Sequence, residues 1–97
     1  MGLQFNLVLA NGLTAPGAYG RVDSVMGSKE SLDFSFNVYS SRKAFIDKLP
    51  QVEQRMYTFT PSVEDDAVNF IKQAYRYIKR LPDYVDAIDV LEYGQTP

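Results

Sequence analysis

The sequence contains no cysteine and no histidine. Without cysteine the chain has no disulfide, no thiolate nucleophile and no thiolate metal ligand. Without histidine it lacks the side chain that most often acts as general base, so catalysis would have to use paired carboxylates, a lysine or a tyrosine. We therefore expect a protein that is not an enzyme and that holds no metal ion or cofactor.

Long apolar runs and a strong net charge are also missing. No apolar run approaches the roughly 20 residues that span a bilayer, and no charged segment precedes a signal-peptide core. Twelve acidic and ten basic residues give a net charge of -2, which does not favour long-range attraction to the phosphates of nucleic acid. We expect a protein that acts away from membranes and nucleic acid, inside a cell or an assembled particle.

What the sequence does contain is an ordinary globular balance with many aromatic residues. Hydrophobic residues make up 45% and charged residues 23% of the 97 residues, which suits one domain over residues 1–97 with one core. Seven tyrosines and six phenylalanines supply large apolar area together with phenolic hydroxyls. Such a composition is typical of a β-rich core and also of a protein interface.

Apolar and polar residues alternate with a period of two over four segments, and this period is typical of half-buried strands. The predicted strands cover residues 3–9, 19–26, 32–39 and 52–59. The alternation is cleanest over 32–39, and we expect 52–59 to pair with it in antiparallel fashion. The apolar positions of this clearest strand are Leu32, Phe34, Phe36 and Val38.

Turn residues separate these segments. Asn11-Gly12 and Pro16-Gly17 predict a turn and loop over residues 10–17. The segment 19–26 carries apolar and polar residues on both faces, and this mixture indicates an edge strand or an interface strand. Residues 40–50 keep neither period, so we interpret them as an excursion between two paired strands.

The period changes to that of a helix after Pro61, and the pattern predicts one amphipathic helix over residues 62–80. Thr60 or Ser62 can cap it, and Pro82 ends it. Its apolar stripe should pack on the sheet, with Phe70 meeting the phenylalanines of 32–39. That stripe consists of Ala67, Phe70, Ile71, Ala74, Ile78 and Leu81.

A last short strand is predicted near residues 87–93. Strands in succession, then one helix and a closing strand, are typical of an α+β fold. We expect an antiparallel sheet of about four to five strands with one long helix, about 62–80, packed on it.

Two charged groups have a functional and a structural interpretation. Lys72, Arg76 and Lys79/Arg80 form a basic strip interleaved with tyrosines, which can contact nucleic acid or can be a solvated helix face. The acidic overall charge favours the solvated face. Glu64, Asp65 and Asp66 lack the spacing and the central glycine of a calcium loop, so we interpret them as favourable charge at a helix start.

The candidate interface lies on two segments. Residues 40–50 expose apolar side chains inside a charged rim, as interface patches do, although Phe45 can instead cap the end of the core. Arg21 and Asp23, beside Tyr19, form either a surface ion pair or a subunit contact. The candidate interface residues are Phe45, Ile46, Leu49, Tyr19, Arg21 and Asp23.

Several stretches resemble a family of small proteins encoded in the tail and baseplate modules of siphophages and prophages of Gram-positive bacteria. The stretches are Ala18-Tyr19-Gly20-Arg21-Val22-Asp23, Leu32-Asp33-Phe34-Ser35-Phe36-Asn37-Val38-Tyr39, Tyr57-Thr58-Phe59-Thr60-Pro61 and Asn69-Phe70-Ile71-Lys72-Gln73-Ala74-Tyr75 with Leu81-Pro82. The resemblance implies a virion or host-cytoplasmic protein with a structural or assembly role. It also implies contacts with itself and with other tail proteins, and a fold similar to the shoulder domain of lactococcal phage receptor-binding proteins.

Two other functions stay open. A small binding module or inhibitor would engage a host macromolecule through the basic strip. A carbohydrate-binding accessory would use tyrosines at the surface.

Overall fold

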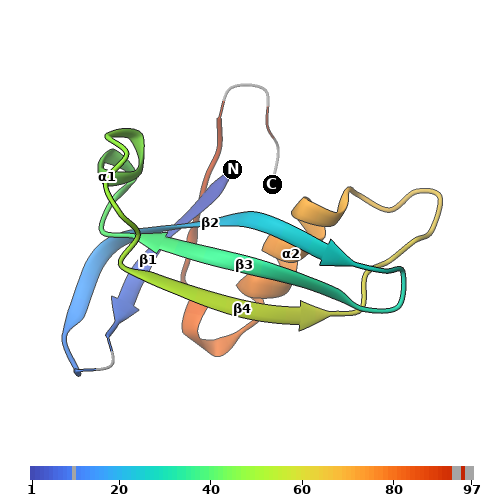
Figure 1. The fold of residues 1–97 in the computed structure, drawn as a ribbon, viewed down its shortest axis with the longest axis horizontal. Helices are drawn as coiled ribbons and strands as arrows, with labels where there is room; N and C mark the ends of the chain where they lie inside the picture. Colours follow the sequence, from blue (N-terminus) through green and yellow to red (C-terminus); the bar gives the residue numbers. More distant parts are fainter. Residues whose placement is uncertain (10, 93–94, 96–97) are drawn as a thin grey trace.

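A five-stranded antiparallel sheet with two α-helices makes up the fold, in a computed structural model that describes residues 1–9, 11–92 and 95 (Figure 1). The strands are β1 (Gly2–Val8), β2 (Thr14–Gly27), β3 (Leu32–Tyr39), β4 (Glu53–Phe59) and β5 (Ile88–Val90). The helices are α1 (Arg42–Ile46), α2 (Phe70–Lys79) and the short 3₁₀ helix η1 (Pro82–Tyr84). The α+β class and the antiparallel sheet are confirmed.

The strand order is β4-β3-β2-β1-β5, and every neighbouring pair is antiparallel. The first four strands form a meander of successive hairpins. The chain then crosses one face of the sheet as α2 and η1 and returns to the far edge as β5 (Figure 1). We call the face under α2 and η1 the covered face and the opposite one the open face.

The core lies between the covered face and α2, as the alternation predicts. β1 directs Leu3, Phe5 and Leu7 inward and exposes Gln4, Asn6 and Val8, and β3 buries its four apolar positions. The helical side of the core consists of Ala74, Tyr75 and Ile78 from α2 with Tyr84 from η1. No helix in residues 1–9, 11–92 and 95 is long and apolar enough to cross a membrane.

β2 contains a bulge where a loop was expected. Phe5 faces Ala18 whereas Leu7 faces Ala15, so Pro16 and Gly17 lie opposite a single residue of β1. The left-handed φ of Gly17, 67°, is one that glycine adopts without strain. The expected loop over residues 10–17 is therefore wrong for its second half, because β2 begins at Thr14; residue 10 lies outside the described residues.

A second bulge explains the mixed faces of the segment 19–26. Val22 faces Phe36 whereas Val25 faces Phe34, so Asp23 and Ser24 share one position and the alternation changes phase. Both valines then turn toward the covered face although they are three residues apart. Of the two alternatives, an edge strand or an interface strand, the edge strand is wrong, because β2 is the middle strand of the sheet.

The long helix over 62–80 is also wrong, because α2 covers only Phe70–Lys79. Asn69 is its N-cap, and its side-chain oxygen accepts the N–H of Lys72 at 2.8 Å. The preceding loop is held by the Gln73 side chain, which bonds to the N–H and C=O of Ser62 and to the C=O of Val68. A cap inside the apolar period thus starts the helix two turns later than the sequence pattern suggests.

The buried stripe of α2 is rotated relative to the predicted one. Tyr75, rather than Ile71, joins Ala74 and Ile78 in the core, and Phe70 is 39% exposed. The expectation that Phe70 meets the phenylalanines of β3 is therefore wrong.

Residues 40–50 contain a helix that the sequence pattern does not predict. α1 begins after Ser41, whose hydroxyl accepts the N–H of Ala44 at 3.0 Å. It ends in a Schellman motif, in which Leu49 N–H bonds to Ala44 C=O and Lys48 N–H bonds to Phe45 C=O. Lys48 takes the left-handed position usual for glycine, with φ of 61°. Capping at both ends stabilises this single turn.

The last predicted strand is present as β5, which pairs with β1 through Gly2 and Val90. It is shorter than the predicted 87–93, and residue 93 lies outside the described residues.

Candidate functional site

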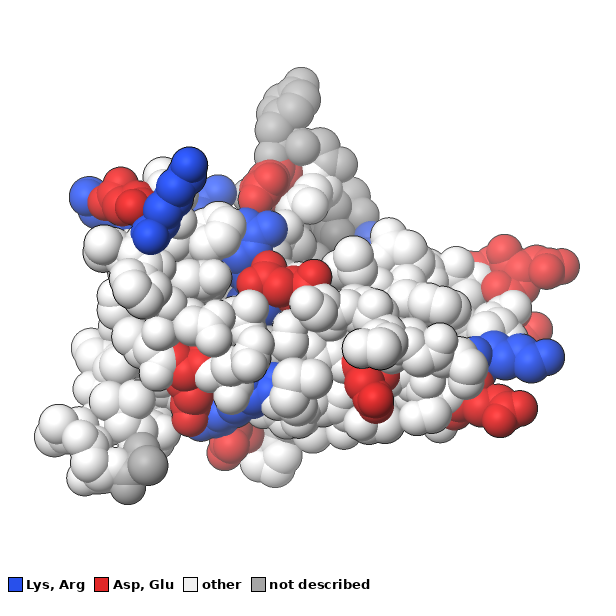
Figure 2. Space-filling view, viewed as in Figure 1, with Lys and Arg blue, Asp and Glu red and all other residues white. Residues whose placement is uncertain are grey.

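The open face of the sheet is left uncovered by α2 and η1. α1 packs on one end of it, and β2, β3 and β4 present the rest (Figure 1). Figure 2 views this face and shows scattered charged groups among larger uncharged areas over the three strands, while charged side chains gather over α1 and at the opposite end. Two methionines, Met26 and Met56, are 74% and 63% exposed. A broad surface of this kind suits a protein partner more than a small ion.

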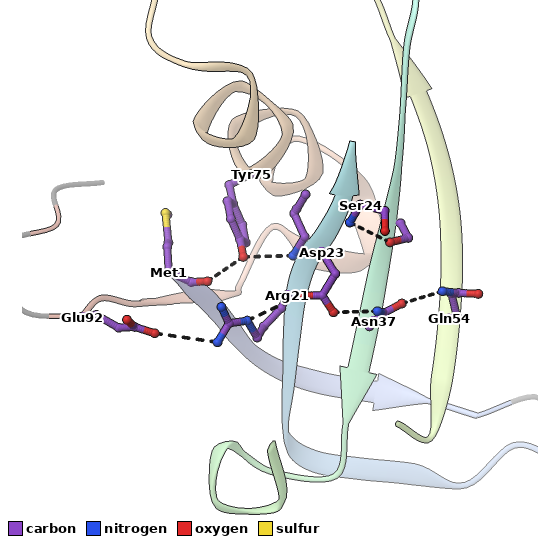
Figure 3. Close-up of polar contacts among 10 residues, drawn as sticks. Met1, Arg21, Asp23, Ser24, Asn37, Gln54, Tyr75 and Glu92 are labelled. Atoms are coloured by element: carbon purple, nitrogen blue, oxygen red, sulfur yellow. Dashed lines mark hydrogen bonds and ion pairs between the residues drawn. The ribbon is translucent and has the colours of Figure 1, made fainter. Parts of the chain in front are cut away.

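A row of polar side chains crosses the open face from strand to strand (Figure 3). Gln54 Nε2 on β4 donates to Asn37 Oδ1 on β3 at 2.9 Å, and Asn37 Nδ2 donates to Asp23 Oδ2 on β2 at 2.6 Å. The row continues through ion pairs from Asp23 to Arg21 at 3.8 Å and from Arg21 to Glu92 at 3.7 Å. We call these five residues the polar row. Because its members bind one another, they are held in place before any partner arrives.

An aromatic cluster supports α1 beside the polar row. The Phe45 ring lies 5.7 Å from the ring of Tyr19 and 5.2 Å from that of Tyr39, between ring centroids. Arg21 Cζ lies 4.2 Å from the Phe45 centroid, in cation–π contact. Tyr19 is fully buried and Phe45 is half-buried. The Phe45 side chain therefore packs α1 onto the sheet.

The two remaining apolar residues of the predicted interface are at the surface. Ile46 is 62% and Leu49 54% exposed, and Arg42, Lys43, Asp47 and Lys48 surround them in sequence and are exposed too. We call Ile46 and Leu49 the α1 patch. The six residues predicted from sequence thus come together at one end of the open face, as exposed patch, supporting rings and polar row.

Sequence analysis missed Asn37, Gln54, Met26 and Met56. The alternation that predicts strands 32–39 and 52–59 already places Asn37 and Gln54 on the polar faces of those strands. Their direct opposition depends on the register of β3 and β4, which the alternation alone does not determine. The face on which Met26 lies was not predictable, because the second bulge in β2 changes the alternation before it.

The basic strip of α2 is divided by local contacts. Lys79 Nζ binds the carboxylate of Asp89 at 3.1 Å, and Arg80 Nε donates to the C=O of Arg76. Neither interleaved tyrosine offers a free ring face, because Tyr75 is buried and Tyr77 stacks on Phe59 at 5.4 Å. Every tyrosine that the structure describes is buried or half-buried, so a carbohydrate platform of exposed tyrosines is not formed by them.

The described part of the chain also forms surface clefts. A cleft of about 430 Å³ lies beside α2, and its described lining includes Arg21, Lys72 and Tyr75 but no carboxylate. Among the same residues no group of three or more Asp or Glu side chains could hold a metal ion. Glu64, Asp65 and Asp66 are exposed on the loop before α2.

The hydroxyl of Tyr75 joins three parts of the chain (Figure 3). It donates to the C=O of Met1 at 2.6 Å and accepts the N–H of Val22 at 2.9 Å, beside the end of β1, which begins at Gly2. Burial raises the pKa of Tyr75 to about 12, from 10.0. The neutral phenol is therefore the form that the folded protein stabilises.

We expect stability to fall between pH 10 and 12 because of this tyrosine. Above pH 10 the unfolded chain loses the phenolic proton while the folded protein still holds it, so the free energy of unfolding decreases as the pH rises. Urea titrations at several alkaline pH values should show a shallower decrease for Tyr75→Phe than for wild type. An equal slope in the two proteins would contradict the assignment.

No protein-family model, curated protein or solved structure matches the chain. The resemblance to tail and baseplate proteins therefore stays a prediction.

Proposed function

We propose that the chain is a non-enzymatic structural or accessory protein of a phage tail or baseplate, and that it acts through protein–protein contacts. The source of the proposal is the resemblance of residues 18–23, 32–39, 57–61 and 69–75 to proteins of these modules. The observation that carries the contact is the α1 patch, two exposed apolar side chains at one end of the open face.

The α1 patch has the properties of an anchor. Ile46 and Leu49 project from a turn that is capped at both ends and supported by the Phe45 ring, so little ordering entropy is lost when a partner covers them. The polar row next to them is pre-ordered and can provide the polar rim that surrounds such anchors. The divided basic strip on α2 gives less support to the alternative, a binding module that uses this strip.

We expect Ile46→Asp and Leu49→Asp to weaken binding to a tail protein by roughly 30-fold or more, the loss typical of a removed hot spot. A carboxylate there would be buried without a partner in the complex, whereas in the free protein it stays in water. The partners to test are the products of the neighbouring genes, and binding is measured by titration calorimetry on purified pairs.

The matched control is Val63→Asp. Val63 is 58% exposed and lies outside the open face, in the loop between β4 and α2. It should leave the affinity unchanged, and circular dichroism should show all three variants folded. The proposal fails if the neighbouring genes encode no tail proteins, or if none of their products binds the chain.

A further inference from the structure

β4 is an edge strand without the usual protection against pairing. All seven of its residues pair with β3 in one register without a shift, and among the described residues no other strand pairs with it. Natural edges are blunted by shortness, proline, lysine or a bulge. β4 has none of these within its sequence EQRMYTF, whereas the opposite edge strand, β5, has only three residues.

The backbone groups of alternate residues in β4 point outward. Val52 N–H donates to the C=O of Val38 at 2.8 Å, which shows that this carbonyl faces β4. Backbone groups alternate in direction along paired strands, so Arg55 and Tyr57 face β3. The N–H and C=O groups of Gln54, Met56 and Thr58 consequently face away from the sheet, where another strand can bind them.

The charges on the covered side of β4 do not oppose such pairing. An inward charge protects an edge when a second strand would bury it without a partner. Here Arg55 Nη2 already contacts Glu53 Oε2 at 3.1 Å, and Arg55 Nη1 donates to the Tyr84 hydroxyl at 2.7 Å. A second strand on this edge would therefore bury Arg55 and Glu53 as an ion pair, and neither charge would lack a partner.

We propose that β4 pairs antiparallel with β4 of a second copy of this chain, about a two-fold axis at Met56. This register uses the whole strand, because Met56 is the middle of its seven residues. It sets Met56 against Met56 of the second copy, and Gln54 against the second copy's Thr58. On the covered side it sets Arg55 against the second copy's Tyr57.

Each of these cross-strand pairs is complementary. The Gln54 amide can bond to a threonine hydroxyl, the Arg55 guanidinium can lie on a tyrosine ring, and two exposed thioethers can pack together. A two-fold axis repeats every favourable pair, which is why a second copy fits this edge better than an unrelated strand. The two sheets become continuous, and both open faces then lie on the same side.

The test uses the fact that Met56 faces Met56 of the second copy in this register. We expect wild type to sediment as a dimer and Met56→Lys and Met56→Glu each to sediment as a monomer, because like charges face each other across the axis. An equimolar mixture of the two variants should recover the dimer mass. Met26→Lys is the matched control, since Met26 is as exposed but lies on β2, away from the edge, and it should stay dimeric.

A cysteine at the axis gives an independent readout, since the chain has no other cysteine. Facing residues of a hydrogen-bonded antiparallel pair have Cα atoms about 5.5 Å apart, so a short crosslinker that joins two thiols can span them. Met56→Cys should form a covalent dimer with such a reagent, and Met26→Cys should not.

Three outcomes would overturn the inference. Wild type is a monomer at the highest attainable concentration; Met56→Lys keeps the dimer mass, which would place the contact elsewhere; or the charged variants do not combine, which would indicate a different register or partner strand. The inference is independent of the α1 patch, because Ile46→Asp should leave the dimer intact.

Discussion

Replacing Tyr84 with alanine should lower the free energy of unfolding by about 3–5 kcal/mol, the cost of removing a large ring from a packed core. Tyr84 is fully buried, and its ring centroid lies 5.0 Å from that of Phe5 and 5.4 Å from that of Phe36. Its hydroxyl also bonds to Arg55 and to Tyr57. Truncation therefore leaves a cavity and removes a partner from each of two polar groups.

Two further variants separate these contributions in urea denaturation. Tyr84→Phe keeps the ring and should cost about 1–3 kcal/mol, through the hydrogen bonds alone. Phe70→Ala removes a ring of similar size that is 39% exposed, so it should cost clearly less than Tyr84→Ala. If Phe70→Ala proved as costly as Tyr84→Ala, the orientation of α2 described above would be wrong.

Gly20→Ala should destabilise the protein by about 1–3 kcal/mol through overpacking. A Cβ atom at Gly20 would lie 2.2 Å from Cζ of Phe36, whose ring is fully buried. The ring cannot turn away without displacing its neighbours in the core. The thermal midpoint and the urea midpoint should both fall.

The same contact predicts a rescue. Phe36→Leu removes the ring atoms that meet the new Cβ, so the double variant should lose less stability than the two single variants together. Simple additivity would show that the two residues do not touch. Gly12→Ala serves as the contrasting case, because no atom lies within 4 Å of its Cβ position and only the backbone φ of 86° opposes it.

The parts of the fold that follow from local periodicity were predictable. The sequences of β1 and β3 alternate apolar and polar residues over most of their length, and β4 alternates half-buried and exposed residues, so these strands were predicted nearly residue by residue. β2 was predicted only in part, because its bulges depend on partners that are distant in sequence. The N–H of Ser24 in the second bulge, for example, is bound by the hydroxyl of Ser35, 11 positions away.

The helices show a different limit. The predicted start of α2 was wrong because the prediction used only the spacing of apolar residues. The helix actually begins after Asn69, whose side chain caps it. α1 has only five residues, too few to show a helical period in the sequence. Its C-terminal end was also hard to recognise, because Lys48 takes the left-handed position where glycine is usual. Only part of the polar row was predictable. Arg21 and Asp23 were predicted as an ion pair, but the contacts of Asn37 and Gln54 depend on the register between strands.

The pairing of β5 with β1 has a consequence for the order in which the chain is completed on the ribosome. The three hairpins from β1 to β4 join strands that are neighbours in sequence and can form as soon as each second strand emerges. The other side of β1 stays unpaired until Ile88–Val90, which follows the other described strands in the chain, has emerged. These three residues pair with the edge of β1. A nascent chain that lacks them leaves the backbone N–H and C=O groups on that side of β1 unpaired, and another strand can bind them.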